Sequence, residues 1–136
     1  MNLLTLQLPW PPSLNHYKKI GRTVRTKSGK LLQFRTNSDQ TKQYYFDVWA
    51  LCKKELGNKK PLECELEIWI YVYPPNNRSF DLDNRCKVLL DSLIHAKVIK
   101  DDSQIMKLHM EKMSKIENGQ VIVEIKELLC PRKNTV

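Results

Sequence analysis

The chain lacks the long apolar segments that mark membrane proteins. Among its 136 residues no apolar run approaches the roughly 20 residues that a membrane-spanning helix requires. The opening sequence MNLLTLQLPWPP has no basic flank and reaches its prolines early, which is untypical of a secretory signal peptide. We therefore expect a cytoplasmic protein that does not contact membranes.

Cysteine pairs with the spacing of metal or redox sites are missing too. The four cysteines are widely separated, with no CxxC pair and no CxxxH cluster beside them, so a zinc site is not expected. In a chain without an export signal, reduced thiols that pack as small hydrophobic side chains are the simplest interpretation. These cysteines are Cys52, Cys64, Cys86 and Cys130.

Acidic residues are absent from the first 38 positions, although the whole chain contains 15 Asp and Glu. That segment carries seven Lys and Arg, whereas residues 39–80 carry six residues of each sign and residues 81–136 carry ten basic and nine acidic ones. The formal net charge of +8 therefore arises almost entirely from the N-terminal part. A basic segment of this kind favours contact with a polyanion.

The length and the 41% hydrophobic content suit one domain with a sizeable core. We place that domain at residues 1–130 and expect residues 131–136 to form a disordered tail. Within the domain, alternating leucines from Leu4 to Leu8 predict a first strand, and the stronger alternation at residues 62–73 predicts a second.

Two segments have the three- and four-residue spacing of apolar side chains that is typical of amphipathic helices. The first begins with an N-cap among residues 37–39 and ends at Gly57. We expect Trp10 and Trp49 to pack rather than to bind a ligand. The expected core positions are Tyr45, Val48, Cys52 and Leu56 in the first helix and Leu82, Cys86, Leu89 and Leu93 in the second.

Two runs near the C-terminus predict further strands. Apolar residues alternate at 106–110 and again at 121–125, with the turn sequence Asn118–Gly119 between them, so we expect an antiparallel C-terminal β-hairpin. The complete order is strand, basic segment, helix, strand, helix and hairpin. This order predicts an α+β fold in which a small mixed β-sheet has two main helices packed on one face.

The basic segment at residues 15–36 contains aromatic side chains between its cations. It predicts either a flexible loop or an irregular hairpin that turns at Ser28 and Gly29. An ordinary solvated loop is one interpretation, and contact with DNA backbones is the other. The residues expected to contact DNA are Asn15, Lys18, Lys19, Arg22, Arg25, Lys27, Lys30 and Arg35, together with Arg78 further along the chain.

An acidic motif, FDLDNRCKVLLD at residues 80–91, stands out in this basic chain. Asp81 and Asp83 are two positions apart, so an extended backbone would project both to one side, and Lys87 follows Asp83 by one helical turn. Asp101 or Asp102 can return to the same place if the second helix and the next strand are antiparallel neighbours. Carboxylates without histidine or thiolate partners suit Mg²⁺, with Mn²⁺ as a substitute.

Structural interpretations of the same residues stay open. An Asp at a helix start is a common N-cap, and Asp83, Lys87 and Asp91 at four-residue spacing can form a solvated salt-bridge face. Asp101 and Asp102 can be plain turn residues. The conjunction of carboxylates with a basic, aromatic-containing segment nevertheless favours a metal-dependent phosphodiester enzyme, because a bound divalent ion can activate water for attack at phosphorus.

Two stretches of the sequence resemble the RusA-type Holliday junction resolvases, a family of small bacterial and phage endodeoxyribonucleases. DLDNRCKVLLDSLIHAKVIKDDSQI resembles the central motif of that family, and LPWPPSLNHY resembles its N-terminal signature. The resemblance implies a homodimer that resolves four-way (Holliday) DNA junctions by paired symmetric nicks in recombination and repair. It also implies metal ligation by Asp81, Asp83 and Asp102 and an active-site role for Lys87, and Asp91 matches a further position of the motif. Asp91 and Asp101 are our candidates for residues that support the ligands.

Other functions are compatible with the same residues. A flap or general branched-DNA endonuclease would share the metal chemistry but would not cut a mobile junction symmetrically. A non-catalytic basic DNA-binding module would bind DNA without metal-dependent nicking, and a small interaction protein would not bind DNA even at low salt.

Overall fold

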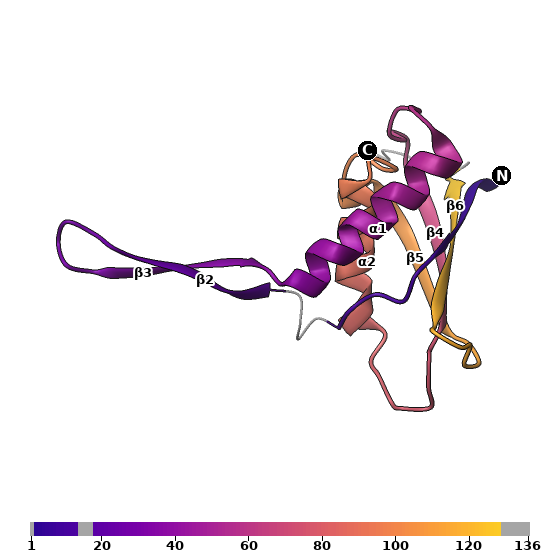
Figure 1. The fold of residues 1–136 in the computed structure, drawn as a ribbon. Helices are drawn as coiled ribbons and strands as arrows, with labels where there is room; N and C mark the ends of the chain where they lie inside the picture. Colours follow the sequence, from indigo (N-terminus) through magenta and orange to yellow (C-terminus); the bar gives the residue numbers. More distant parts are fainter. Residues whose placement is uncertain (1, 14–17, 129–136) are drawn as a thin grey trace, which may run out of the picture.

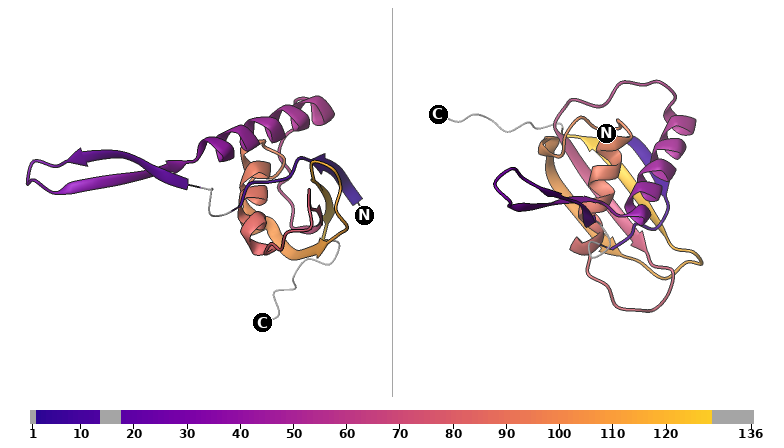
Figure 2. Two further views of the ribbon diagram at one scale, coloured as in Figure 1. Left: turned by 60° about the horizontal axis from the view of Figure 1, so that its bottom comes forward. Right: turned by 60° about the vertical axis from the view of Figure 1, so that its left-hand side comes forward.

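The computed structural model describes residues 2–13 and 18–128, and it has an α+β fold, as predicted. A four-stranded sheet is covered on one face by two helices, and a separate hairpin projects away from this body (Figures 1 and 2). Asn15 and residues 131–136, for which DNA contact and a disordered tail are predicted, lie outside the described residues. The sheet contains β1 (Asn2–Leu8), β4 (Leu66–Tyr73), β5 (Ile105–Lys112) and β6 (Gln120–Glu127). The helices are α1 (Asp39–Leu56) and α2 (Asp83–His95).

The strand order is β1-β6-β4-β5, which corrects the predicted pairing of the last two strands. β5 pairs with β4 in parallel and β6 pairs with β4 antiparallel, so β4 lies between the two strands that were expected to form a hairpin. The connection between them passes the end of β4, where Met113 N–H donates to the Val72 carbonyl at 2.8 Å and Ile116 N–H to the Pro74 carbonyl at 2.9 Å. These bonds hold the connection against the end of β4, so that β6 pairs with the edge of β4 opposite to β5.

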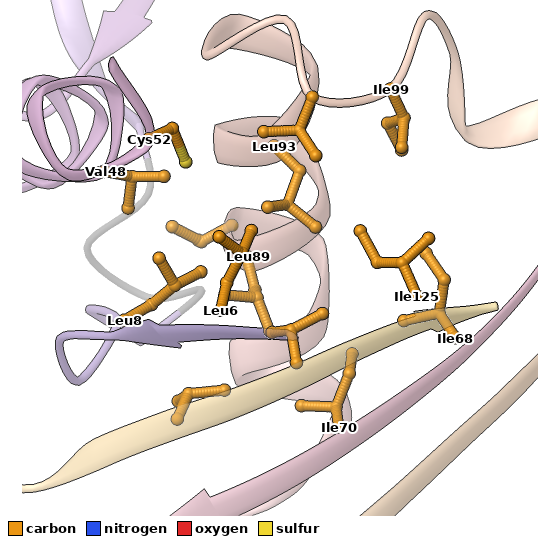
Figure 3. Packing of buried hydrophobic residues seen from close by; sticks show 14 of the residues in the cluster. Leu6, Leu8, Val48, Cys52, Ile68, Ile70, Leu89, Leu93, Ile99 and Ile125 are labelled. Atoms are coloured by element: carbon orange, nitrogen blue, oxygen red, sulfur yellow. The ribbon is translucent and has the colours of Figure 1, made fainter. Parts of the chain in front are cut away.

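The core lies between the sheet and the two helices (Figure 3). Along β4 the side chains alternate strictly between buried and half-buried, because successive residues of a strand point to opposite faces. The buried set, Leu66, Ile68, Ile70 and Val72, faces α1 and α2. Leu6 and Leu8 of β1 and Val121, Val123 and Ile125 of β6 extend the same apolar surface.

α1 begins and ends where the capping residues predict. The Ser38 hydroxyl accepts a hydrogen bond from Thr41 N–H at 3.2 Å, and Gly57 ends the helix with a φ of 64°, a conformation that glycine adopts at little cost. The buried face differs by one position from the prediction: Tyr44, not Tyr45, lies in the core, and its hydroxyl donates to the Pro9 carbonyl at 2.9 Å. Trp49 is 41% exposed, and its ring lies at the surface with its centre 6.0 Å from that of Phe46.

α2 buries a face centred slightly away from the predicted one. Leu89 and Leu93 are in the core as expected, but Val88 and Ser92 complete the buried face, while Leu82 and Cys86 are only half-buried. Ser92 is accommodated there because its hydroxyl donates to the Leu89 carbonyl at 2.5 Å.

The basic segment forms a hairpin of β2 (Lys18–Arg25) and β3 (Leu31–Asn37), one of the two predicted alternatives. Its turn is closed by hydrogen bonds from Thr26 N–H to the Lys30 carbonyl at 2.8 Å and from Gly29 N–H to the Thr26 carbonyl at 2.9 Å. Gly29 has a φ of 84°, where a side chain would be strained. Neither helix in the described part of the chain is long and apolar enough to cross a membrane.

Candidate active site

The centre of the candidate site is the outer face of α2. Lys87 Nζ lies 3.1 Å from Asp91 Oδ1, one helical turn further on, as the four-residue spacing predicts. Lys87 is 54% exposed and Asp91 is 19% exposed, so the lysine amine reaches solvent while its partner is largely covered. Asp83 stands in the first turn of the same helix, where a negative charge is favoured by the helix dipole.

A second segment brings Asp102 toward the face of α2 that carries Lys87 and Asp91. The hydrogen bond to Asp91, then the charges of Asp91 and Asp102, raise the pKa of the Lys87 amine, which keeps it protonated. Asp102 begins the short 3₁₀ helix η2 (Asp102–Gln104), which connects the end of α2 to β5. The two segments are far enough apart in sequence that only the tertiary fold brings their charges together.

One glutamine fixes the segment that carries Asp102. Gln104 Oε1 accepts from the backbone N–H groups of Lys100 and Asp101, both at 2.8 Å, and Gln104 Nε2 donates to the carbonyls of Leu62 at 2.7 Å and Cys64 at 3.0 Å. The bonds to Leu62 and Cys64 attach the loop to the segment that leads into β4, and the bonds from Lys100 and Asp101 fix the loop itself. Gln104 therefore positions Asp102 relative to the sheet.

Asp101 has a structural partner beside it. Its side chain accepts from the Ser103 hydroxyl at 2.5 Å and caps η2, and the Ser103 bond is the main reason that the pKa of the Asp101 carboxyl is lowered. Asp102 is exposed and lacks this capping role. The geometry thus separates Asp101 as the cap from Asp102 as the side chain open to a ligand.

Asp81 lies in the turn before α2, and its geometry differs from the prediction. Leu82 has φ −60° and ψ −42°, which are helical values, so the extended backbone expected to align Asp81 with Asp83 does not occur. Asp81 is exposed and accepts a long hydrogen bond of 3.4 Å from Asn84 Nδ2. The turn, not strand alternation, sets where its carboxylate points.

Aromatic and cationic side chains hold that turn against the sheet. The ring of Phe80 meets Trp10 edge-to-face at 5.2 Å, and Lys112 Nζ lies 4.6 Å from the Phe80 ring centre while donating to the Phe80 carbonyl at 2.6 Å. Arg85 stacks over Trp10 at 5.0 Å and donates to the Pro11 carbonyl at 2.6 Å. The PWPP segment after β1 is thereby attached to the residue that precedes Asp81.

The predicted carboxylates converge only in part. Among the described residues, no group of three or more His, Cys, Asp or Glu side chains is close enough to hold a metal ion. The exposed donors are nevertheless all carboxylates, and Mg²⁺ takes one or two carboxylates with waters and phosphate oxygens in its remaining positions. Burial, and then the charge of Asp83, raise the pKa of the Cys86 thiol, so Cys86 stays protonated and is not a suitable ligand.

The sequence analysis did not single out Gln104, Arg85 and Lys112, which support the site. Gln104 was recognisable, since it stands three residues after Asp101 in the pattern of a capping box. The partners of the Asp81 turn, Phe80, Arg85 and Lys112, carry no such local signal, because their contacts join segments that are distant in sequence.

The predicted DNA-contacting residues lie mainly on the hairpin. Arg25, Lys27 and Lys30 are exposed at its tip, and Arg78 is exposed in the turn that carries Asp81. Lys18, Lys19, Arg22 and Arg35 are placed along its two strands. Figure 1 shows that the hairpin extends away from the helices, so these positions are spread along an arm.

Comparison with known proteins adds an independent line of support. Residues 9–126 match the family model described as endodeoxyribonuclease RusA. A crossover junction endodeoxyribonuclease of Enterobacteria phage HK97 is 32% identical, with 94% of this chain and 98% of the relative covered. The enzymes of the same name from Escherichia coli strain K12 and Enterobacteria phage 82 are each 30% identical over the same shares. The chain therefore belongs to the RusA family of endodeoxyribonucleases.

Proposed function

We propose that this protein is a metal-dependent endodeoxyribonuclease that resolves four-way DNA junctions by paired nicks in opposing strands. The observation that carries the proposal is the ion pair of Lys87 with Asp91 on α2, which η2, the segment that begins at Asp102, also contacts. The names of the relatives, crossover junction endodeoxyribonucleases, supply the substrate class. The family model matches residues 9–126, a range that includes the motif at residues 81–102.

Asp81, Asp83 and Asp102 are the proposed ligands of Mg²⁺, with Mn²⁺ as a substitute. All three side chains are exposed and offer hard oxygen donors. Asp83 begins α2, Asp81 precedes it, and η2, which begins at Asp102, contacts α2. A bound ion supplies charge neutralisation at the phosphate and a lowered pKa for the attacking water.

The remaining residues of the site have distinct proposed roles. Lys87 keeps its positive charge and stabilises the negative charge that develops on the phosphoryl oxygens. Asp91 orients the Lys87 amine through its 3.1 Å contact. Asp101 and Gln104 hold the loop from which Asp102 reaches the site.

The basic hairpin is the proposed contact to the DNA backbone. Lysine and arginine contacts to phosphates add affinity without sequence information and weaken as salt rises. We further propose that the protein acts as a homodimer, because a junction with two-fold symmetry requires two active sites for paired cutting.

The Asp83→Asn variant tests the proposal. The unsubstituted protein and this variant are incubated with four-way, flap and linear duplex DNA in Mg²⁺, in Mn²⁺ or in a chelator. We expect symmetric nicks on the four-way junction only with the unsubstituted protein and a divalent ion. The variant is expected to bind the junction normally but to lose about 1000-fold or more of the rate, since a carboxamide binds the ion poorly.

The matched control is Asp47→Asn. Asp47 is also a helical aspartate, but it lies on α1, where it accepts a hydrogen bond from Gln43. It should cut like the unsubstituted protein. Undiminished cutting by Asp83→Asn would remove Asp83 from the site. Preferred cutting of flaps would identify a branched-DNA endonuclease instead, and binding without any metal-dependent nicking would identify a non-catalytic module.

A further inference from the structure

α1 carries an exposed row in which two aromatic rings lie between two lysines, Lys42, Phe46, Trp49 and Lys53, which we name the aromatic–lysine stripe. Their spacing of three and four residues places them on one side of the helix. Phe46 is 58% exposed and Trp49 is 41% exposed, and their ring centres are 6.0 Å apart. Two large rings side by side in water form an apolar surface that a partner can cover.

Two hollows flank Trp49 on the side of α1 that faces α2. One, of about 320 Å³, is lined by Lys42, Tyr45, Phe46, Trp49 and His95. The other, of about 200 Å³, lies between the ends of the two helices, and its lining includes Lys53, Lys59 and Lys97. The residues that line these two hollows include no Asp or Glu. The stripe therefore offers rings and positive charge together.

The other exposed flank of α1 has a different character. Gln43, Asp47, Leu51 and Glu55 repeat every four residues, and Gln43 Nε2 donates to Asp47 Oδ1 at 2.9 Å. The carboxylates at positions 47 and 55 are thus kept on this flank, away from the stripe. Such separation of charge along one helix indicates that the partner of the stripe is negatively charged.

The stripe is continuous with the active-site face of α2. His95 stands one turn after Asp91, and its ring stacks on Tyr45 with centres 5.2 Å apart and planes at 28°. Figure 2 shows α1 and α2 side by side over the same face of the sheet. A strand of DNA held at Lys87 can therefore continue across this stacked pair onto the rings of α1.

A second copy of the chain is a poorer partner for this surface. In a two-fold symmetric contact the same patch meets itself, so the lysines of one copy would face those of the other. The lining residues of the two hollows supply no carboxylate to neutralise them. DNA supplies phosphates for the lysines and flat bases for the rings.

We propose that the aromatic–lysine stripe binds a single-stranded segment of the branched substrate, with unstacked bases on Phe46 and Trp49 and phosphates at Lys42 and Lys53. The inference rests on the proposed function, because it assigns the stripe to the strand that leaves the active site. Exposed rings between cations are the means by which proteins bind single strands without sequence preference.

Binding is measured in the Asp83→Asn background with chelator, so that no cutting occurs. The probes are oligo(dT) of about 15 nucleotides and a blunt duplex of equal length. We expect Phe46→Ala and Trp49→Ala each to weaken oligo(dT) binding about tenfold, through the loss of base stacking, and to change duplex binding by about twofold or less. Trp49→Phe should recover most of the lost affinity, because a ring is restored.

Leu51→Ala is the matched control, since Leu51 is 37% exposed on the opposite flank of α1. It should bind oligo(dT) like its parent. Unchanged oligo(dT) binding by Trp49→Ala overturns the proposal, and so does a shift from dimer to monomer in sedimentation without a loss specific to single strands. A failure of the proposed nuclease function would instead appear as an absence of cutting by the unsubstituted protein, with this binding difference intact.

Discussion

The candidate active site and the β2–β3 hairpin are both charged, but the fold supports them in opposite ways. The acidic residues stand on α2 and on two segments that are attached to the body of the protein by side-chain hydrogen bonds and ring contacts. The hairpin extends away from that body and is held by its own ladder and turn (Figure 1).

This difference matches the role that we propose for each region. Chemistry at a phosphate requires charges fixed within a fraction of an ångström, and that precision comes from supporting contacts. Binding of a DNA backbone requires mainly positive charge and reach, because phosphate contacts are tolerant of small displacements. We therefore expect substitutions in the site to lower the rate and substitutions in the hairpin to lower the affinity.

Lys87→Met is expected to have the largest effect outside the proposed ligands. It removes the charge next to the reacting phosphate while keeping the length of the side chain, and should lower the rate at saturating junction about 100-fold or more. Single-turnover kinetics in Mg²⁺ measure this. Lys107→Met is the control and should cut normally, because Lys107 is exposed on β5 beside Glu67, on the sheet face away from the helices. A loss of affinity without a loss of rate would place Lys87 among the DNA-binding residues.

Gln104→Ala comes next, since it removes all four hydrogen bonds that hold the Asp102 loop. We expect a 10- to 100-fold rise, to order of magnitude, in the Mg²⁺ concentration for half-maximal cutting, as for other residues that orient metal ligands. Junction binding in chelator should be unchanged. A purely structural role would instead lower the melting temperature and leave the Mg²⁺ dependence as it was.

The smallest effect is expected from Lys18→Ala, Lys19→Ala and Arg22→Ala combined in the hairpin. Junction affinity should fall about tenfold near physiological salt, and the slope of log affinity against log salt should become shallower by about three. The rate at saturating junction should not change. Unaltered affinity and slope would show that these charges are only solvated. A lowered rate at saturating junction would show that the hairpin contributes to the cutting step.

Local features of the fold could be predicted from the sequence. Strand alternation at β1 and β4, the Ser38 cap, the Gly57 end of α1 and the pairing of Lys87 with Asp91 all depend on residues close together in the chain. The order of these elements was sufficient for the α+β class. For the same reason the spacing of the acidic motif placed Asp83, Lys87 and Asp91 on one face of α2.

Features that depend on distant segments could not be predicted in the same way. The placement of β4 between β5 and β6 is decided by the contacts of the connection after Met113, which no short pattern encodes. The helical backbone at Leu82 and the bond from Lys112 to Phe80 likewise reflect the packed turn. Trp49 was expected to pack because large rings usually do; it lies at the surface of α1, where its ring centre is 6.0 Å from that of Phe46.

The central claim is that a metal-dependent site on α2 makes paired nicks in branched DNA. The most direct test maps the nicks that the unsubstituted protein makes in a mobile four-way junction, with each strand labelled in turn, in Mg²⁺ and in chelator. We predict nicks at symmetric positions on two opposing strands in Mg²⁺ and none in chelator. Intact strands in Mg²⁺, or nicks that persist in chelator, would contradict the account.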